Sequence, residues 1–497
     1  MSYSCPTSAD GFGFTQEEIN ETVSRNGLLS MEIEFSLACN FSCPYCYNDI
    51  QKGESELTSQ EIDKVLLDAK ELGARKIIIL GGEPMIYPEI HDKIRFIRRH
   101  GMGVEMFTNG SCMTPENAMF MHDNGVAVVL KMNSFNPELQ NRMAGRDDAN
   151  EIIQSAYRNL RDAGYPSTGK RLAVSTVICD QNIDELPDLW RWLRKRDIEP
   201  YFEMITPQGG AADSDWIKAS VPKQEKLFAE LAEIDRNEFG HEWEPQPPLV
   251  GNVCLRHQFS CLVNAHGTVM PCVGVTIPLG NIRETSLKEI LDKSEVLENL
   301  RDFPNRIKGP CRECEKSSVC YGCRGAAYQL TGDYLASDPT CWLNQSRAID
   351  YLPADIGSFI PQQPPMRLVD TLLEVGERRA RLQAEIKEDN PFLSESGTLD
   401  EAAYIELIAQ SAAGLEGFHS SPGERERHQG FLIGAKKVEF SGAARVGDTL
   451  EIEIEKIGRF GEFGVIGGVI RRGTEEIARG QINIFKKEDD GEHDPAE

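Results

Sequence analysis

Three cysteines lie within eight residues of one another near the N-terminus. Cys39, Cys43 and Cys46 form a C-x3-C-x2-C pattern with aromatic residues among them, and residues 31–37 just before them read as a strand. Thiolates hold iron–sulfur clusters, and a 4Fe–4S cluster normally takes four of them. Three thiolates therefore hold three irons and leave the fourth iron open to a small molecule. The alternative is a zinc site, although zinc knuckles usually use paired C-x2-C units.

A second motif, Gly81-Gly82-Glu83-Pro84, follows the apolar run of residues 76–80. The cysteine spacing followed by an aromatic residue, together with this motif, resembles the radical S-adenosylmethionine (SAM) superfamily. The resemblance implies that Cys39, Cys43 and Cys46 are the catalytic cluster ligands and that the open iron binds the amine and carboxylate of SAM. It further implies that Gly81, Gly82, Glu83 and Pro84 contact the SAM amino group, with Tyr45 as an additional cofactor-binding residue.

The segment 245–345 is rich in cysteine. It contains Cys254, Cys261, Cys272, Cys311, Cys314, Cys320, Cys323 and Cys341. Eight cysteines are the number needed for two fully ligated 4Fe–4S clusters. The run from Cys261 to Cys272 predicts a hairpin with Gly267 in the turn. Read without context, the run from Cys311 to Cys323 also fits a zinc ribbon.

The order of these cysteines resembles the SPASM extension of radical SAM enzymes. The resemblance implies a first auxiliary cluster on Cys254, Cys261, Cys272 and Cys323, and a second on Cys311, Cys314, Cys320 and Cys341. Because the two sets interleave, we expect cluster binding and folding of the segment to be coupled. Sulfatase-maturing members carry a catalytic Asp directly after the third of these cysteines. Val273 stands there, which leaves a catalytic base unidentified.

The elements that must position these residues alternate between strand and helix. Apolar strands are predicted over residues 31–37, 77–80, 104–108, 126–131, 172–179 and 201–205, with helices between them that begin at capping residues such as Thr58 and Thr114. This α/β order favours a parallel sheet. Periodicity leaves a doubly wound sheet and a barrel open, and the family resemblance implies a partial (β/α)6 TIM-like barrel.

Polar residues stand at the predicted carboxyl ends of the strands, where the sites of such folds are built. By analogy with the family, Asn133, Ser134 and Ser175 would contact the SAM carboxylate and ribose. Each of them, taken alone, fits a turn or packing role equally well. Cys5, Cys112 and Cys179 receive no assignment, and a buried inert thiol is the favoured interpretation for the last two.

The C-terminal third has no cysteine after Cys341 and predicts one apolar helix over residues 399–418 among long strands. The order of these elements, the segment from Pro364 to Asp370, and the Ile405-Glu406 pair resemble the hotdog-fold hydroxyacyl-ACP dehydratases, an α+β fold. Glu406 matches the catalytic Glu of that family, while the partner His has no counterpart. A lone carboxylate is half of an acid–base pair. We therefore expect either binding of an acyl-thioester or carrier protein, or a homodimer through the hotdog domain.

We predict an N-terminal extension (1–28), a radical SAM core (29–238), a SPASM iron–sulfur domain (239–350), a hotdog domain (351–487) and an acidic tail (488–497). The net charge of −26 argues against a nucleic-acid partner and against docking on anionic membranes. Residues 1–27 show no apolar signal segment, and no run is long enough to span a bilayer. The sequence therefore predicts a cytoplasmic protein.

Together these features predict an oxidoreductase of the maturase type. It would cleave SAM reductively to a 5′-deoxyadenosyl radical and take a hydrogen from a peptide or from an acyl-carrier- or CoA-linked thioester. Its cofactors would be SAM and three 4Fe–4S clusters, two of them auxiliary and used in electron transfer. An external electron donor of the flavodoxin or ferredoxin type is implied. The competing hypothesis is a non-catalytic iron–sulfur carrier or scaffold with a thioester-binding module.

Overall fold

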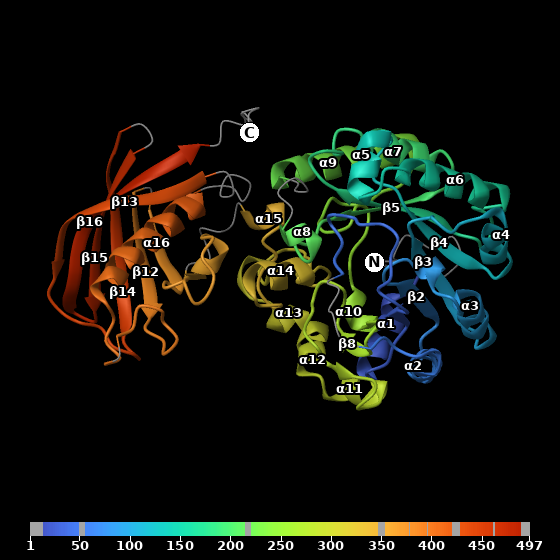
Figure 1. Ribbon diagram of the computed structural model, residues 1–497, viewed down its shortest axis with the longest axis horizontal. Coiled ribbons are helices and arrows are strands. Elements are labelled where there is room, and N and C mark those ends of the chain that lie inside the picture. The colour runs from blue at the N-terminus through green and yellow to red at the C-terminus, as the bar shows by residue number, and fades with distance from the viewer. Residues whose placement is uncertain are drawn as a thin grey trace. The chain divides into compact units, whose positions relative to one another are not determined.

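The computed structural model describes residues 13–48, 55–213, 220–345, 353–376, 378–394, 396–419, 428–460 and 463–488. It divides into two compact units, Met1–Trp342 and Leu343–Glu497, which run from blue to yellow and from orange to red in Figure 1. Cys5 and nearly all of the predicted acidic tail lie outside the described residues. The domain boundaries within the first unit stay a prediction.

Six parallel strands form the centre of the first unit. They are β1 (Ser30–Glu34), β2 (Lys76–Leu80), β3 (Gly103–Thr108), β4 (Val126–Lys131), β5 (Leu172–Ile178) and β6 (Glu199–Met204), and they neighbour one another in chain order. A doubly wound sheet would reverse its strand order at a switch point. This sheet has no reversal across β1 to β6, so the chain winds in one direction, as in a TIM-like core.

Helices cover the outside of these strands (Figure 1). They are α2 (Ser59–Glu71), α3 (Ile90–Arg99), α4 (Pro115–Asp123), α5 (Pro137–Ala144), α6 (Ala149–Asp162) and α7 (Leu186–Arg194). The predicted caps are present, because the Thr58 and Thr114 side chains accept from the backbone three residues ahead. Helix α5 was not predicted from the sequence. Helix α7 starts at Leu186, after a loop in which the Asn182 side-chain amide donates to the carbonyls of Asn133 and Val177.

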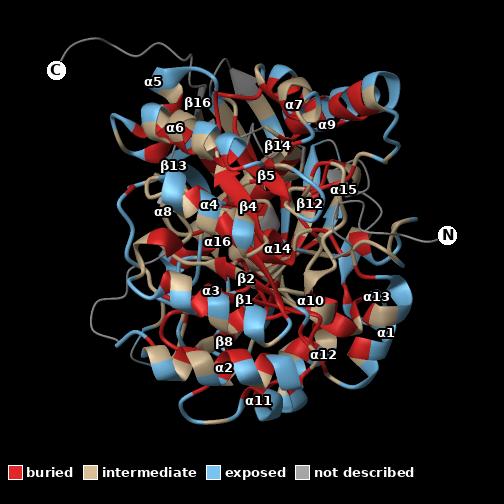
Figure 2. Ribbon diagram, turned by 90° about the vertical axis from the view of Figure 1, so that its right-hand side faces the viewer, coloured by how far each residue is buried: buried red, intermediate tan, exposed pale blue. Residues whose placement is uncertain are grey.

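The two faces of the parallel sheet differ in chemistry. In β2, Ile77 and Ile79 are buried while the alternate residues are half-buried, and Figure 2 shows the buried strands behind helices with exposed outer faces. The opposite face carries charge: Arg171 pairs with Glu105 at 2.7 Å and also with Glu199. This inner layer is polar although it is shielded, which is typical of a face that lines a site.

A cysteine-rich extension continues the same sheet. Strand β7 (Leu262–Val263) pairs in parallel with β1, and β8 (Thr268–Met270) and β9 (Gly280–Asn281) follow as antiparallel neighbours. Gly267 has φ +83° in the β7–β8 turn, as the predicted hairpin requires. The helices of this part are α8 (Gly210–Asp213), α9 (Val221–Ile234), α10 (Arg256–Phe259), α11 (Leu287–Lys293), α12 (Glu295–Arg301), α13 (Phe303–Arg306), α14 (Arg324–Thr331) and α15 (Trp342–Gln345).

The second unit is a seven-stranded sheet with one long helix, α16 (Glu401–His419). Its strands are β10 (Ala354–Asp355), β11 (Thr371–Val375), β12 (Arg379–Glu385), β13 (His428–Phe440), β14 (Thr449–Phe460), β15 (Phe463–Arg472) and β16 (Glu475–Glu488), in the order β10-β11-β12-β14-β15-β16-β13. All neighbours are antiparallel. Buried residues of α16, including Leu407 and Ile408, share one core with Ile452 and Ile470 of the sheet. The second unit therefore holds one long apolar helix and long strands, as predicted, and its sheet is antiparallel.

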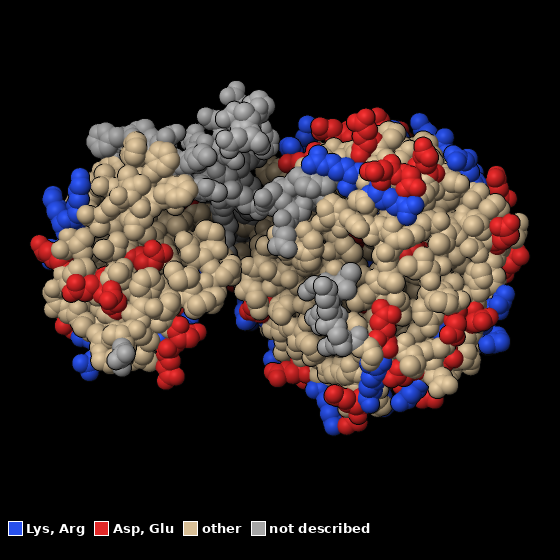
Figure 3. Space-filling model, viewed as in Figure 1, with Lys and Arg blue, Asp and Glu red and all other residues tan. Residues whose placement is uncertain are grey.

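Charged side chains of both signs alternate over the face of the molecule drawn in Figure 3. The sequence carries 79 acidic and 53 basic residues, which gives the net charge of −26. That face thus shows the mixed pattern of a solvated surface rather than one continuous basic area. Among the described residues, no helix is both long and apolar enough to cross a bilayer.

Candidate functional site

The segment of residues 36–47, which contains Cys39, Cys43 and Cys46 and is called the cysteine loop from here on, follows β1 (Ser30–Glu34) and is held by the motif at the end of β2. Gly82 N–H donates to Ser36 O at 3.0 Å, and Glu83 N–H donates to Ala38 O at 2.8 Å. A Cβ on Gly82 would lie 2.0 Å from Ala38 O. Only glycine permits this approach. The motif at residues 81–84 and the cysteine loop are therefore held together by direct backbone contacts.

Glycines from two further loops support the cysteine loop from other sides. A Cβ on Gly145 would lie 2.0 Å from Ser42 O, and one on Gly209 would lie 2.5 Å from Cys46 O. Gly210 N–H donates to Cys46 O at 2.9 Å. Backbone from the end of α5 and from the segment after β6 thus meets the loop. Neither contact was found from the sequence, because no local pattern signals that two backbones approach each other.

The three thiols of the cysteine loop differ in access. Cys39 is exposed, while Cys43 and Cys46 are half-buried. Burial raises the pKa of Cys43 to about 11, helped by the neighbouring Cys46 thiolate. Phe41 N–H points at Cys39 Sγ at 3.4 Å. An amide that donates to sulfur stabilises the thiolate form, and partial exposure leaves room for a small molecule beside the loop.

The Glu83 carboxylate is buried and occupied by neighbours in the structure. It accepts hydrogen bonds from Met85 N–H at 3.0 Å, Thr108 Oγ1 at 2.7 Å and Asn109 N–H at 2.6 Å. The carboxylate therefore joins the ends of β2 and β3. Because the side chain is engaged in this way, the backbone of residues 81–84 is the part left to meet a cofactor, and the predicted SAM contact stays a prediction.

Asn133 and Ser134 lie at the end of β4 and are fully buried. Asn133 Nδ2 donates to Tyr45 Oη at 2.7 Å, and its Oδ1 accepts from Val177 N–H at 2.9 Å. Ser134 Oγ donates to Glu185. These residues connect the cysteine loop with β5 and α7. Their predicted contacts with SAM are untested, and the packing role is the one that the structure displays.

Ser175 belongs to a polar group of which only Ser175 itself and Tyr45 were predicted from the sequence as site residues. Ser175 Oγ accepts from Lys131 Nζ at 3.0 Å, and Lys131 Nζ lies 3.6 Å from Glu203 Oε1. The same ammonium lies 5.4 Å from the centroid of the Tyr45 ring. Lys131 ends an otherwise apolar strand, which was the signal available in the sequence. The group places a movable cation and a carboxylate beside the cysteine loop.

The residues 254–341, called the cysteine field from here on, contain two electrostatic groups of thiols. Thiolates at Cys254 and Cys272 raise the pKa of Cys323 after burial and Asp338, and thiolates at Cys311 and Cys314 do the same for Cys320. Burial is the largest cause in both groups. Cys320 and Cys323, which are close in sequence, therefore have different thiols as charged neighbours, while Asp338 raises the pKa of both. Ligation of iron by these cysteines stays a prediction.

The donor set of the cysteine field fits iron–sulfur clusters. Backbone N–H groups point at sulfur in three places: Val275 at Cys272 (3.4 Å), Gly322 at Cys320 (3.3 Å) and Ala326 at Cys323 (3.3 Å). Among the described residues, no three metal-binding side chains converge tightly enough to hold one metal ion. In a 4Fe–4S cluster each thiolate binds its own iron, so the ligands stand further apart.

Two thiols outside these groups have ordinary surroundings. Cys179 is fully buried beside Met143, and burial raises its pKa to about 11. Cys112 is half-buried next to the hydroxyl of Ser111, 3.8 Å from its sulfur. Both fit the interpretation as inert thiols.

In the second unit, Glu406 lies half-buried on α16 with Gln410 as its partner. Gln410 Nε2 donates to Glu406 Oε1 at 2.9 Å and to Met366 O at 2.7 Å, while its Oε1 accepts from Leu368 N–H at 2.8 Å. The glutamate is thus tied to the segment before β11. The structure gives it an amide partner, which cannot exchange a proton with it as an imidazole would.

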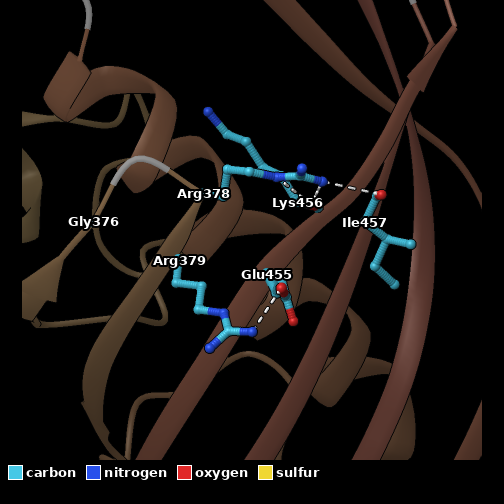
Figure 4. A pocket seen from close by; sticks show the side chains of 6 residues that line it. All are labelled: Gly376, Arg378, Arg379, Glu455, Lys456 and Ile457. Carbon is cyan, nitrogen blue, oxygen red and sulfur yellow. Dashed lines mark hydrogen bonds and ion pairs between the residues drawn. The ribbon is translucent and has the colours of Figure 1, made fainter.

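A pocket of the second unit lies at the start of β12, beside the paired part of β14, and is lined by Gly376, Arg378, Arg379, Glu455, Lys456 and Ile457 (Figure 4). Arg379 Nη2 pairs with Glu455 Oε1 at 2.8 Å. Arg378 donates to the carbonyls of Lys456 and Ile457, and Lys456 Nζ pairs with Glu416 of α16 at 2.6 Å. Three cations thus border this pocket, and the guanidinium of Arg378 binds carbonyls rather than a carboxylate.

Comparison with protein families divides the chain in the same way as the site residues do. A model of the radical SAM superfamily matches residues 33–193, and a model of an iron–sulfur cluster-binding domain (SPASM) matches residues 254–315. A model of the ApeP dehydratase matches residues 354–493. The first two contain the cysteine loop and most of the cysteine field, and the third contains Glu406.

Individual relatives cover the first unit. The chain is 27% identical over 336 residues to the AdoMet-dependent heme synthase of Methanosarcina barkeri, covering 62% of this chain and 94% of that protein. It is 28% identical over 363 residues to the PqqA peptide cyclase of Streptomyces rochei, covering 67% and 96%. The fold resembles that of Streptococcus suis SuiB bound to S-adenosylmethionine, with a TM-score of 0.51 and 16% identity over 66% of this chain and 81% of that chain.

The relatives in the first unit are enzymes, which sets aside the hypothesis of a non-catalytic carrier. The matched domains support the binding of iron–sulfur clusters and of SAM. The chain therefore carries, in order, a segment that matches the radical SAM superfamily, a segment that matches a SPASM iron–sulfur cluster-binding domain and a segment that matches the ApeP dehydratase.

Proposed function

We propose that this enzyme uses one SAM-binding cluster on Cys39, Cys43 and Cys46 and two auxiliary clusters in the cysteine field to remove a hydrogen atom from a peptide or thioester-bound substrate. The observation that carries the proposal is the backbone connection between Gly82-Glu83 and the cysteine loop. It brings the two motifs that this chemistry requires into contact. Nothing in a purely structural iron–sulfur protein would require that approach.

When bound, the cluster and SAM supply reductive cleavage of SAM to methionine and a 5′-deoxyadenosyl radical. The chain's own residues then have two tasks. The glycine contacts fix the position of the cysteine loop. The half-buried pair Lys131–Glu203 offers an ammonium for an anionic substrate group and a carboxylate that can hold a proton. The buried ion pair of Arg171 and Glu105 lies on the same face of the sheet as Lys131.

A peptide is the substrate class that the relatives favour. The Streptomyces rochei relative is named a peptide cyclase, and SuiB has a structure with its precursor peptide. The Methanosarcina barkeri relative is named a heme synthase, so the same core serves other substrates as well. An acyl-thioester substrate is the second candidate, and the match of residues 354–493 to a dehydratase supports it.

For the second unit we propose a hotdog fold that binds an acyl-thioester or carrier protein and does not dehydrate it. Glu406 has an amide partner, Gln410, in place of the base that dehydration requires. The pocket at Arg378, Arg379, Glu455 and Lys456 offers the Arg378 guanidinium, which binds only carbonyls among the described residues, to an anionic carrier or phosphopantetheine group. A homodimer through the sheet is the alternative role. An external flavodoxin- or ferredoxin-type donor completes the set of partners.

The function is tested with anaerobically reconstituted full-length protein, dithionite and SAM, followed by chromatography for 5′-deoxyadenosine. We expect 5′-deoxyadenosine in the wild type and none in Cys43→Ala. The variant should retain about two-thirds of the iron if three clusters are present. Absence of the product from iron-loaded wild type would overturn the proposal.

A further inference from the structure

Tyr321 is a buried tyrosine whose hydroxyl meets a thiol of the cysteine field. It is 1% exposed, and its Oη donates to Cys254 Sγ at 3.7 Å. The same oxygen accepts from the backbone N–H of His257 at 3.4 Å. A phenol has a single proton to donate. Because the His257 amide uses the oxygen as an acceptor, that proton is directed to the sulfur.

The position of the hydroxyl is fixed by packing on the ring. Tyr321 belongs to the last compact run of cysteines, whereas Cys254 lies 67 positions earlier. The Tyr321 ring meets the Phe303 ring edge-on, with centroids 5.1 Å apart, and lies 5.3 Å from the His257 ring. Phe303 and Ile307 share a small buried core with Tyr321. The contact with Cys254 is therefore set by tertiary packing rather than by a local turn.

The charged side chains near Cys254 come as a pair of opposite sign. The Arg256 guanidinium interacts with the thiolates of Cys254 and Cys272, and it pairs with the Glu32 carboxylate. Glu32 acts on Cys272 with the opposite sign. The ion pair thus brings one charge of each sign to these thiols. The Tyr321 hydroxyl differs from it, because it is a neutral donor directed at one sulfur.

A hydrogen bond to a thiolate sulfur of an iron–sulfur cluster changes the reduction potential of that cluster. Reduction adds negative charge to the iron and its thiolates, so a donor stabilises the reduced state more than the oxidised state. Backbone N–H groups also point at Cys272 and Cys323, but no substitution of a side chain removes them directly. The donor at Cys254 belongs to a side chain, and its effect can therefore be measured.

We propose that Tyr321 raises the reduction potential of one auxiliary cluster through its hydrogen bond to Cys254 Sγ, and so makes that cluster a better electron acceptor. Tyr321 is a positioning residue, because it acts through the Cys254 sulfur and not on the substrate. The inference rests on the proposed function, which places two auxiliary clusters in the cysteine field. The ligands that the family resemblance implies for this cluster are Cys254, Cys261, Cys272 and Cys323.

The test is a redox titration of the full-length variant Cys39→Ala/Cys43→Ala/Cys46→Ala, reconstituted anaerobically and followed by electron paramagnetic resonance. Its remaining clusters are the auxiliary ones. Tyr321→Phe in this background keeps the ring and removes the hydroxyl. We expect unchanged iron and a lower potential for one of the two clusters. At a fixed solution potential, the ratio of reduced to oxidised cluster should fall about three- to tenfold, a shift of at most about 59 mV.

The matched control is Tyr334→Phe in the same background. It removes a hydroxyl that accepts from Asn299 Nδ2 at 3.0 Å, and the described part of the chain shows no hydrogen bond from Tyr334 to a thiol. The control should shift neither potential. Iron-loaded Tyr321→Phe with both potentials unchanged would overturn the inference and leave the proposed function standing. A parent variant without iron would overturn the auxiliary clusters of the proposed function and the inference with them, and iron analysis separates the two failures.

Two further measurements keep the proposal decidable. If Tyr321→Phe alone loses iron, the parent variant is grown with fluorinated tyrosine, whose phenol is a stronger donor. The potential of one cluster should then rise, and an unchanged potential would count against the proposal. In a Cys254→Ala background, Tyr321→Phe should shift no remaining potential, because the sulfur that it contacts is gone. A shift that persists there would show that the hydroxyl acts elsewhere, and the inference would be wrong.

Discussion

The cysteine loop and the cysteine field both present thiols, but different parts of the chain hold them. The loop is positioned by backbone: Gly82, Gly145 and Gly210 approach its carbonyls, and its thiols stay partly exposed. The field is positioned by side chains: Asp338 and Tyr321 are buried among its eight thiols, of which four are buried and four are partly buried. A site that must admit a small molecule needs a rigid, open frame. A site that only holds a cluster can use the bound cluster as part of its own buried core.

The largest difference between the cysteine field and the strands β1 to β6 should appear when iron is removed. Apo protein should lose amide-exchange protection in residues 254–341, because the helices there span at most eight residues and the strands two or three, so that bound clusters would join many short elements. Strands β1 to β6 should stay protected, since their core of apolar residues does not involve the thiols. Hydrogen exchange by mass spectrometry on apo and reconstituted protein measures this. Equal loss of protection in both regions would contradict the comparison.

Gly82→Ala should damage the cysteine loop selectively. The added Cβ would lie 2.0 Å from Ala38 O, so the loop must move, at a cost of about 1–3 kcal/mol. We expect loss of 5′-deoxyadenosine formation and of about a third of the iron, with the auxiliary clusters retained. The matched control is Gly101→Ala, where φ is +74° but nothing lies within 4 Å of the new Cβ. It should lower stability through backbone strain and leave the activity intact.

How much of this could be read from the sequence differs between the two regions. The strands before Cys39 and Gly81 follow from apolar runs, and the C-x3-C-x2-C and Gly-Gly-Glu-Pro patterns carry their own chemistry. The approach of Gly145 and Gly210 to the loop could not be read, because it joins residues more than a hundred positions apart. In the field, the sequence shows eight cysteines, but their spacing does not show on which face of the sheet Cys261 lies. That depends on its pairing with β1.

Asp338→Ala is the counterpart of Gly82→Ala in the cysteine field. The buried carboxylate accepts from Cys323 N–H at 2.6 Å, Thr340 N–H at 2.8 Å and Thr340 Oγ1 at 2.7 Å. Removing it leaves buried donors unpaired, which costs about 2–3 kcal/mol. Auxiliary iron should fall while the cluster of the cysteine loop remains, as seen by iron analysis and by retained SAM cleavage. Asp292→Ala, which removes a surface pair with Lys288, is the control and should change neither.

The smallest effect should come from the ion pair that connects the two regions. Arg283 of the field donates to Glu61 at 2.7 and 3.2 Å and to the carbonyls of Ser55 and Glu56, between the cysteine loop and α2. The bonds from Arg283 and the Thr58 N–H lower the pKa of Glu61 from 4.5 to about 2. A lowered carboxyl pKa stabilises the fold above its unfolded value, so this contribution is complete above pH 4.5 and is lost as the pH falls towards 2.

Glu61→Gln should therefore cost at most about 1 kcal/mol at pH 7, because the pair is partly exposed. The difference between variant and wild type should shrink steadily below pH 4.5. Stopped-flow urea unfolding of the anaerobically reconstituted protein, started at pH 7 and at pH 4 and followed by the signal of the barrel, measures it, because the field that carries Arg283 is expected to fold only with its clusters. A difference that stays constant between those two pH values would show that the ionised carboxylate does not help to connect the field to the loop. The connection would then rest on the arginine's bonds to the Ser55 and Glu56 carbonyls alone.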